Sequence, residues 1–323
     1  MKKILTYILF ISLNIFIISK VTDIVVPKAL NRYYMLEKYL ESVDNEFDIQ
    51  VYGSCHAYTS FNPTYLKENY NLDAFVYANP SEIIPVTYLR MLENFKNYKP
   101  NVAFVEIWGI NAFDTYIPTD RILDEFLNPN LERLPLTKEK IEVIKDFNKN
   151  FLEMNIPIIR YKDRLMNNSI YQNDFEYTFE GTLEQSDYYI YPEMVYRLSN
   201  NGYKIYKSKD LSDYPQKQNK VEDDDYMKLE SEIEKYIDKI IALCAKYNVK
   251  LIFYRTPYIS TENELRKLNY LKNKLEKENA TFIDLEKEIK FNYKTDFTDE
   301  HHLSTTGANK ATKYLTEKFL INI

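Results

Sequence analysis

Glycine, histidine and cysteine are scarce in this chain, and each shortage narrows the classes of protein to which it can belong. The 323 residues include only 5 glycines, 3 histidines and 2 cysteines. Two cysteines are too few for a disulfide framework or for a zinc site built from cysteine alone. The 48 acidic residues outnumber the 42 basic ones, and the resulting net charge of −6 argues against nucleic acid as the main partner. With 45% hydrophobic residues, the chain can form a large packed core.

An apolar run without a charged residue fills positions 4–19, between Lys3 and Lys20. It is short for a membrane-spanning helix, which needs about 20 residues, and a signal-peptide core or a buried first helix are the alternatives. No small-residue cleavage site follows the run, so we expect an uncleaved anchor. Because Lys2 and Lys3 precede it, the positive-inside rule predicts a single-pass protein of the cell membrane, with a cytoplasmic N-terminus and the rest of the chain outside the cytoplasm.

Beyond the anchor, apolar strands alternate with helices, which predicts an α/β fold with a parallel sheet covered by helices on both sides. Asn62 before Pro63 marks one helix start. Thr261 and Glu264 form a capping box for a second helix, and Ser304 opens the last one. The expected strands are 48–53, 74–77, 102–107, 249–254 and 281–285.

We expect three parts along the chain. Residues 1–27 form the transmembrane anchor, 28–47 a helical stalk, and 48–323 the α/β domain. The alternation of strands and helices stops at about residues 116–220, which are polar, rich in tyrosine and partly helical. We therefore interpret this stretch as an insertion in the domain rather than as a linker.

The first candidate site segment is Gly53-Ser54-Cys55-His56, directly after the first expected strand. In open α/β sheets, ligands bind outside the carboxyl ends of the strands, so a nucleophile is well displayed there. Glycine permits a sharp turn, and the N-terminus of a following helix favours a thiolate. We expect His56 to point away from Cys55 and to be structural or substrate-facing.

Two more segments carry polar side chains at strand or helix ends. In Trp108-Gly109-Ile110-Asn111, the amide of Asn111 can donate a hydrogen bond to an oxygen that becomes negative in a tetrahedral intermediate. The third segment runs from Asp299 to Ala308. Its Asp299 and His302 are three residues apart in a turn, so the carboxylate can orient the imidazole toward a nucleophile.

The scarce residues gather in these three segments. All three histidines lie in the first and the third, and Gly53, Gly109 and Gly307 account for three of the five glycines. Since strand ends converge at one edge of a parallel sheet, we expect the three segments to form a single site.

In their order along the chain, the segments resemble the motif blocks of the SGNH/GDSL hydrolase superfamily. The Asp-x-x-His-Leu at 299–303, which leads into a helix with Gly-Ala, is the most specific of them. The chain resembles most the membrane-anchored, extracytoplasmic branch that includes the teichoic-acid D-alanyl transfer protein and the alginate and peptidoglycan O-acetylation proteins. The resemblance covers the first third and the last quarter of the chain.

This resemblance implies a fold, an activity and partners. The fold is a three-layer α/β/α sandwich, with residues 48–323 as its catalytic domain. Several such proteins act beside a polytopic membrane-bound O-acyltransferase that exports acyl groups. We therefore expect a partner of that kind to deliver the acyl group, a polysaccharide as substrate, and neither a cofactor nor a metal.

The chain departs from the family pattern in two places. Cys55 stands where the family usually has serine, so either Cys55 is the nucleophile, or Ser54 is, or the site is degenerate. A cysteine–histidine pair is chemically competent for acyl transfer through a thioester, which favours Cys55. The glycine that the family supplies to the oxyanion hole in its second block has no clear counterpart, because residues 78–81 read Ala-Asn-Pro-Ser.

The resulting hypothesis is O-acyl transfer, with acetyl as the expected group, to a cell-surface or secreted polysaccharide. Cys55, activated by His302 and oriented through Asp299, carries the acyl group as a thioester. The backbone N–H of Cys55 and the amide of Asn111 stabilise the oxyanion.

Several alternatives stay open at this point. Ser54 is the alternative nucleophile, and Ser54 or Gly109 can support the oxyanion. An esterase that removes acyl groups uses the same residues with water as the acceptor. A catalytically silent module that binds glycan or a partner protein is the third reading. Cys55 can also be a small buried residue, or form a disulfide with Cys244, which is most simply a core residue.

Overall fold

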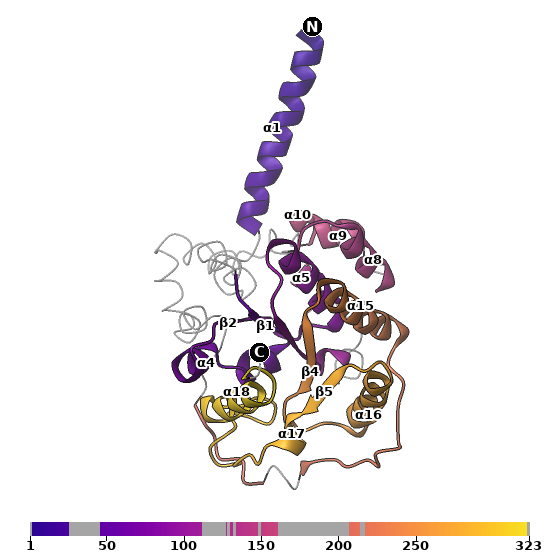
Figure 1. Ribbon diagram of the computed structural model, residues 1–323. Helices are drawn as coiled ribbons and strands as arrows, with labels where there is room; N and C mark the ends of the chain where they lie inside the picture. The colour runs from indigo at the N-terminus through magenta and orange to yellow at the C-terminus, as the bar shows by residue number, and fades with distance from the viewer. Residues whose placement is uncertain are drawn as a thin grey trace.

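The computed structural model describes residues 2–25, 46–111, 127, 130–131, 134–147, 150–160, 207–213 and 217–321. Its centre is a five-stranded parallel sheet (Figure 1), which confirms the predicted α/β class. The strands lie in the order β2-β1-β3-β4-β5. Their bounds are β1 Ile49–Gly53, β2 Ala74–Ala78, β3 Val102–Glu106, β4 Lys250–Arg255 and β5 Thr281–Asp284.

The topology of the sheet singles out the ends of β1 and β3. Every residue of β1, β2 and β3 is buried, as expected for parallel strands that have helices on both faces. The chain passes from β1 to β2 on one side and returns to β3 on the other side of β1. The carboxyl ends of β1 and β3 therefore flank a topological switch point, which is where open α/β sheets bind ligands.

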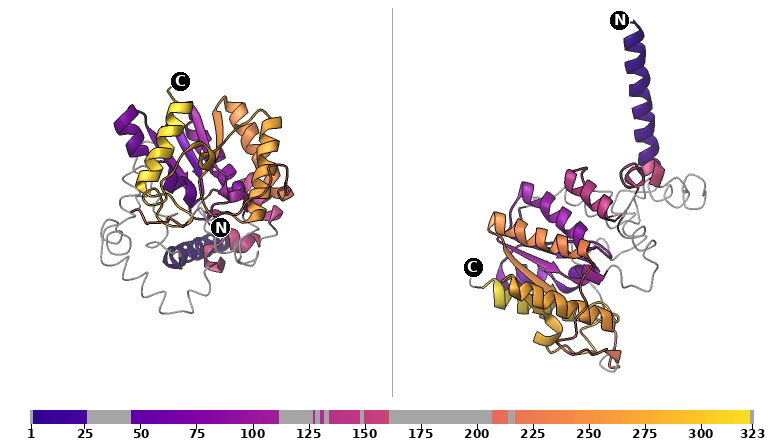
Figure 2. Two further views of the ribbon diagram at one scale, coloured as in Figure 1. Left: turned by 90° about the horizontal axis from the view of Figure 1, so that it is seen from below. Right: turned by 90° about the vertical axis from the view of Figure 1, so that its right-hand side faces the viewer.

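Helices cover both faces of the sheet (Figure 2). Alternate strand residues pack against each set of helices. Tyr52 and Val105 pack into the core under one set, and Val51 and Phe104 into the core under the other. The first set comprises α5 Ile84–Asn97, α15 Ser231–Tyr247 and α16 Glu262–Lys277. The second set comprises α3 Cys55–Ser60, α4 Pro63–Tyr70 and α18 Thr305–Phe319.

The three predicted helix starts are confirmed. The Asn62 side chain caps α4, and Thr261 and Glu264 form the capping box of α16, with hydrogen bonds of 3.2 and 2.7 Å. Ser304 caps α18 by accepting a hydrogen bond from the N–H of Gly307. Each cap satisfies backbone donors that have no partner within the helix.

The N-terminal helix α1 (Lys2–Val25) extends away from the sheet (Figure 1). Its segment Lys3–Thr22 is long and apolar enough to cross a membrane, and none of it is buried against the rest of the structure. A helix of 20 residues is about 30 Å long, which matches the hydrocarbon core of a bilayer. The structure thus contains the helix that an anchor requires, and the orientation of the chain across the membrane stays a prediction.

Two predicted parts of the chain lie largely outside the described residues. The stalk at 28–47 overlaps them only at residues 46 and 47, and much of the insertion at 116–220 is also outside. The described part of the insertion contains α8 Lys138–Asp146, α9 Phe151–Asn155 and α10 Pro157–Arg160. The division of the chain into anchor, stalk and domain therefore stays a prediction.

Deletion of residues 2–25 should move the protein from the membrane fraction to the soluble fraction, because it removes the exposed apolar helix and no part of the sheet core. The measurement is fractionation after a carbonate wash, with N-terminal sequencing of the full-length chain as the control. A full-length product that is soluble and begins after residue 19 would contradict the anchor and indicate a cleaved signal peptide.

Candidate active site

A cavity of about 420 Å³ opens beside the first turn of α3. All three candidate segments contribute to its wall, through Cys55 and His56, through Trp108 and through His302. Residues 259–261, which follow β4, complete one side. The structure thus brings the three segments together at the carboxyl ends of the strands.

Gly53 and a buried glutamate set the turn between β1 and α3. Gly53 has a φ of +136°, and a Cβ at this position would lie 2.8 Å from the Cβ of Glu106, so the site requires glycine. The buried carboxylate of Glu106 accepts hydrogen bonds from Ser54 Oγ and from the N–H of Trp108, both at 2.8 Å. Ser54 Oγ accepts the N–H of His56 at 3.3 Å and caps α3. These bonds fix the first turn of α3 at the end of β1.

Ser54 therefore acts within the turn and does not line the cavity. Its side chain is fully buried, and its hydroxyl already donates to Glu106. Cys55, the first residue of α3, is half-buried and lines the cavity. Of the two candidate nucleophiles, the structure brings only Cys55 to the cavity.

The loop before α18 carries the third segment to the same place. An antiparallel bridge between Phe297 and Leu303 closes this loop, and His302 lies just before its end. At Gly307, an added Cβ would stand 2.1 Å from the carbonyl oxygen of Asp296, so the helix start and the loop can approach only with glycine. This close approach explains the glycine in the third segment.

Asp299 and His302 are hydrogen-bonded as their spacing predicts. Nδ1 of His302 lies 2.9 and 3.0 Å from the two carboxylate oxygens of Asp299. Asp299 Oδ1 also accepts the backbone N–H groups of His301 and His302, at 2.8 and 2.9 Å. Burial favours the neutral acid, but the hydrogen bonds from His302 and the backbone outweigh it, so the pKa of Asp299 is lowered. The carboxylate is therefore ionised and holds the imidazole by Nδ1.

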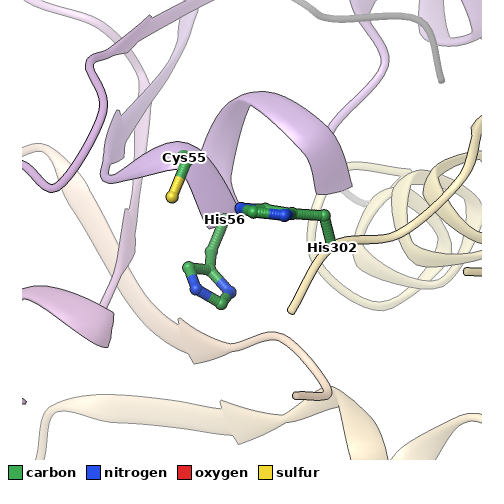
Figure 3. A group of neighbouring side chains, drawn as sticks. All are labelled: Cys55, His56 and His302. Atoms are coloured by element: carbon green, nitrogen blue, oxygen red, sulfur yellow. The ribbon is translucent and has the colours of Figure 1, made fainter. Parts of the chain in front are cut away.

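Cys55 and His302 lie close together at the cavity (Figure 3). The sulfur of Cys55 and one ring nitrogen each of His56 and His302 lie within 4.8 Å of one another. Burial favours a neutral imidazole, but the hydrogen-bonded carboxylate of Asp299 and the neighbouring sulfur of Cys55 outweigh it and raise the pKa of His302 to about 10. A histidine next to a cysteine is the group that exchanges a proton with the sulfur when the cysteine acts as a nucleophile.

His56 lies in the cavity, so the expectation that it points away from Cys55 is wrong. Its ring stacks on Trp108 with centroids 5.6 Å apart, and its Nδ1 lies 3.0 Å from the hydroxyl oxygen of Thr256. Burial, and then the charge of His302, lower the pKa of His56 well below its usual value. Successive residues of a helix point only about 100° apart, and the cavity is wide enough to receive both side chains.

Asn111 and Gly109 are not brought to the cavity. Asn111 is buried, and its amide donates to the hydroxyl of Tyr258 at 3.0 Å. Gly109 is buried too and lies against the backbone of Glu82. The 3₁₀ turn Trp108–Asn111 leads the chain from the strand end into the core, so Trp108 is the residue of this segment that reaches the cavity.

Sequence reasoning missed Glu106, Thr256 and Tyr258. Glu106 had a usable signal, since it is the one charged residue in the otherwise apolar stretch 102–107. A charged side chain on a strand buried on both faces must find hydrogen-bond partners nearby. Thr256 and Tyr258 follow β4 and had no comparable signal.

The two cysteines are both free thiols, so the alternative of a disulfide is wrong. Cys244 is buried in the core beneath α5 and α15, whereas Cys55 packs against the core on the other face of the sheet. Burial raises the pKa of the Cys244 thiol to about 12, which makes it unreactive near neutral pH.

A scan against models of known protein families finds no match to the chain, and a search of curated proteins finds none either. The resemblance to the SGNH superfamily therefore stays a prediction from the sequence of the three segments.

Replacing Glu106 by glutamine should change how stability depends on pH. Burial raises the pKa of Glu106 in the folded protein to about 7. Protonated Glu106 therefore contributes fully to the free energy of unfolding below about pH 4.5, and this contribution is lost as the pH rises through 7. From about pH 5 to about pH 8, the free energy of unfolding of wild type should fall relative to E106Q by on the order of 2 kcal/mol. Denaturant unfolding at several pH values measures this.

The matched control is Glu288→Gln. A hydrogen bond from Tyr314 lowers the pKa of this surface carboxyl. The free energy of unfolding of wild type relative to E288Q should therefore not fall between pH 5 and pH 8, or should rise. A stability difference between E106Q and wild type that does not vary with pH would contradict the assignment of a raised pKa to Glu106.

Iodoacetamide should alkylate Cys55 and leave Cys244 unmodified in the folded protein, because Cys244 is buried. In His302→Ala, the rate at Cys55 near neutral pH should fall about tenfold, since the imidazole that lies beside the sulfur and activates it is lost. Mass spectrometry of the two cysteine peptides gives both rates. Equal rates for wild type and H302A would show that His302 does not activate Cys55.

Proposed function

We propose that the protein is a membrane-anchored, extracytoplasmic O-acyltransferase of the SGNH type, built on a three-layer α/β/α sandwich. The carrying observation is that Cys55 and His302 line one cavity with a sulfur and a ring nitrogen within 4.8 Å of each other, while Nδ1 of His302 is hydrogen-bonded to Asp299. A thiol, an imidazole and a carboxylate in this order are the groups that nucleophilic acyl transfer uses. The apolar helix α1 supports attachment to the cell membrane.

The first half-reaction loads the acyl group. The Cys55 thiolate attacks the carbonyl carbon of an acyl donor, and the bond from that carbon to the donor's oxygen breaks. His302 gives a proton from its Nε2 to the leaving oxygen while Asp299 holds Nδ1. The acyl group, acetyl in this proposal, stays on Cys55 as a thioester.

The second half-reaction passes the acyl group on. A hydroxyl of the polysaccharide loses its proton to Nε2 of His302 and attacks the thioester carbon. The carbon–sulfur bond breaks, and the Cys55 thiolate is restored.

Both tetrahedral intermediates carry negative charge on the former carbonyl oxygen. The backbone N–H of Cys55, in the first turn of α3, is the donor that we assign to this oxygen. We do not assign the same role to Asn111, because its amide already donates to Tyr258.

A second cavity of about 690 Å³ supports the choice of acceptor. Asn219 lines both cavities, so the larger one adjoins the cavity that Cys55 lines. Its wall carries carboxylates such as Glu222 and Asp284, which accept hydrogen bonds from sugar hydroxyls. We place the polysaccharide acceptor there. The donor side is assigned to a polytopic membrane-bound O-acyltransferase, because the acyl group must reach a thiol outside the cytoplasm.

The test is the acetyl content of surface polysaccharide in cells that carry variants in place of wild type. Cys55→Ala and His302→Ala should lower it at least about tenfold, because the nucleophile or the base is removed. In Cys55→Ser the acetyl content should fall as well, because a hydroxyl is far harder to ionise than a thiol. Cys244→Ala, which changes the buried thiol on the other face of the sheet, is the matched control and should retain wild-type acetylation.

Mass spectrometry of the Cys55 peptide after exposure to an acetyl donor should detect the thioester. Full acetylation in both alanine variants would contradict the proposal and leave a silent binding module. A thioester that yields only free acetate, with no transfer to polysaccharide, would instead indicate an esterase.

A further inference from the structure

Three side chains at the cavity carry the donor atoms that soft divalent metal ions prefer. Cys55 offers a sulfur, and His56 and His302 each offer a ring nitrogen, and these three atoms lie within 4.8 Å of one another (Figure 3). In a tetrahedral zinc site, bonds of about 2.3 Å to sulfur and about 2.0 Å to nitrogen place the donor atoms roughly 3.5 Å apart. The three atoms thus lie within about 1.3 Å of the separations that such a site requires.

Both imidazoles are already held in the way that ligand histidines are held. Nδ1 of His302 contacts the carboxylate of Asp299, and Nδ1 of His56 lies 3.0 Å from the hydroxyl oxygen of Thr256. In metal sites, a second-shell acceptor of this kind takes the N–H of one ring nitrogen and turns the other nitrogen toward the metal. With Nδ1 of each ring in these contacts, Nε2 is the nitrogen of each ring that we assign to the metal.

We propose that Cys55, His56 and His302 form a three-ligand site for Zn²⁺, with the fourth position open to water from the cavity. The set of one sulfur and two nitrogens excludes Mg²⁺ and Ca²⁺, which prefer oxygen. On binding, one sulfur–zinc and two nitrogen–zinc bonds form, and the proton on Nε2 of the His302 imidazolium passes to solvent, so that both ring nitrogens and the Cys55 thiolate are free of protons where they meet the metal. The ion then occupies the sulfur that reacts as a nucleophile, so zinc reversibly blocks Cys55. The binding itself does not depend on the proposed acyl transfer.

The experiment titrates the full-length chain in detergent micelles with Zn²⁺, and with Cd²⁺ for spectroscopy. We expect one zinc per chain by equilibrium dialysis and an ultraviolet cadmium–thiolate band. Cys55→Ser should abolish the band, and both Cys55→Ser and His302→Ala should weaken zinc binding at least about tenfold. Asp299→Asn, which keeps all three ligands and changes only the second shell, should weaken it about 10- to 100-fold.

Two variants serve as matched controls. Cys244→Ala removes the buried thiol, and His301→Ala removes the histidine next to His302; both should keep the zinc affinity within about twofold. Because His56 is buried, His56→Gln is measured beside His56→Ala, and thermal unfolding of each shows whether it folds. A folded His56 variant should lose affinity as His302→Ala does.

Zinc should also slow the alkylation of Cys55 at least about tenfold, and a chelator should restore the rate. Absence of stoichiometric zinc, equal binding by wild type and Cys55→Ser, or equal loss in His301→Ala and His302→Ala would overturn the site. A chain that binds zinc at Cys55 yet transfers no acyl group would keep the metal site and lose the proposed function.

Discussion

The carboxylate of Glu106, buried at the end of β3, ties together the two loops that shape the cavity. It accepts hydrogen bonds from the hydroxyl of Ser54, after β1, and from the N–H of Trp108, after β3 itself. A buried carboxylate destabilises the fold unless such hydrogen bonds are made. If either loop moved away, it would leave the carboxylate buried without one of its hydrogen bonds. Gly53 makes the arrangement sterically feasible because the chain passes directly against Glu106. The contacts of Glu106 with these two loops fix the position of Cys55, and the chemical roles proposed for the cavity depend on that position.

Much of the fold was predictable because its signals are local. The stretch 102–107 is almost wholly apolar and became β3, and the cap residues Asn62 and Ser304 start helices as expected. The pairing of Asp299 with His302 was also predictable, since residues three apart in a turn are neighbours whatever the rest of the chain does. The rule that ligands bind at strand ends then indicated where these local features would meet.

The features that the sequence did not reveal depend on contacts between distant segments. Asn111 was expected at the cavity, but the hydroxyl of Tyr258 takes its amide, and only the packing of the loop after β4 decides this. The placement of His56 depends likewise on Trp108 and Thr256, from two other loops. The proposed zinc ligands were not predictable for the same reason, because an adjacent cysteine and histidine with a third residue far along the chain match no known zinc spacing. The predicted insertion and stalk stay predictions, because they lie largely outside the described residues.

The order in which the ribosome makes the parts of this cavity also matters. Cys55 precedes His302 by roughly 250 residues, and at about 5–20 residues per second some 12 to 50 s separate their appearance during translation. β1, β2 and β3 can pair in this interval, but the imidazole that lies beside the sulfur in the folded protein does not yet exist. The cysteine–histidine pair of the proposed mechanism therefore forms late, when α18 packs against α3.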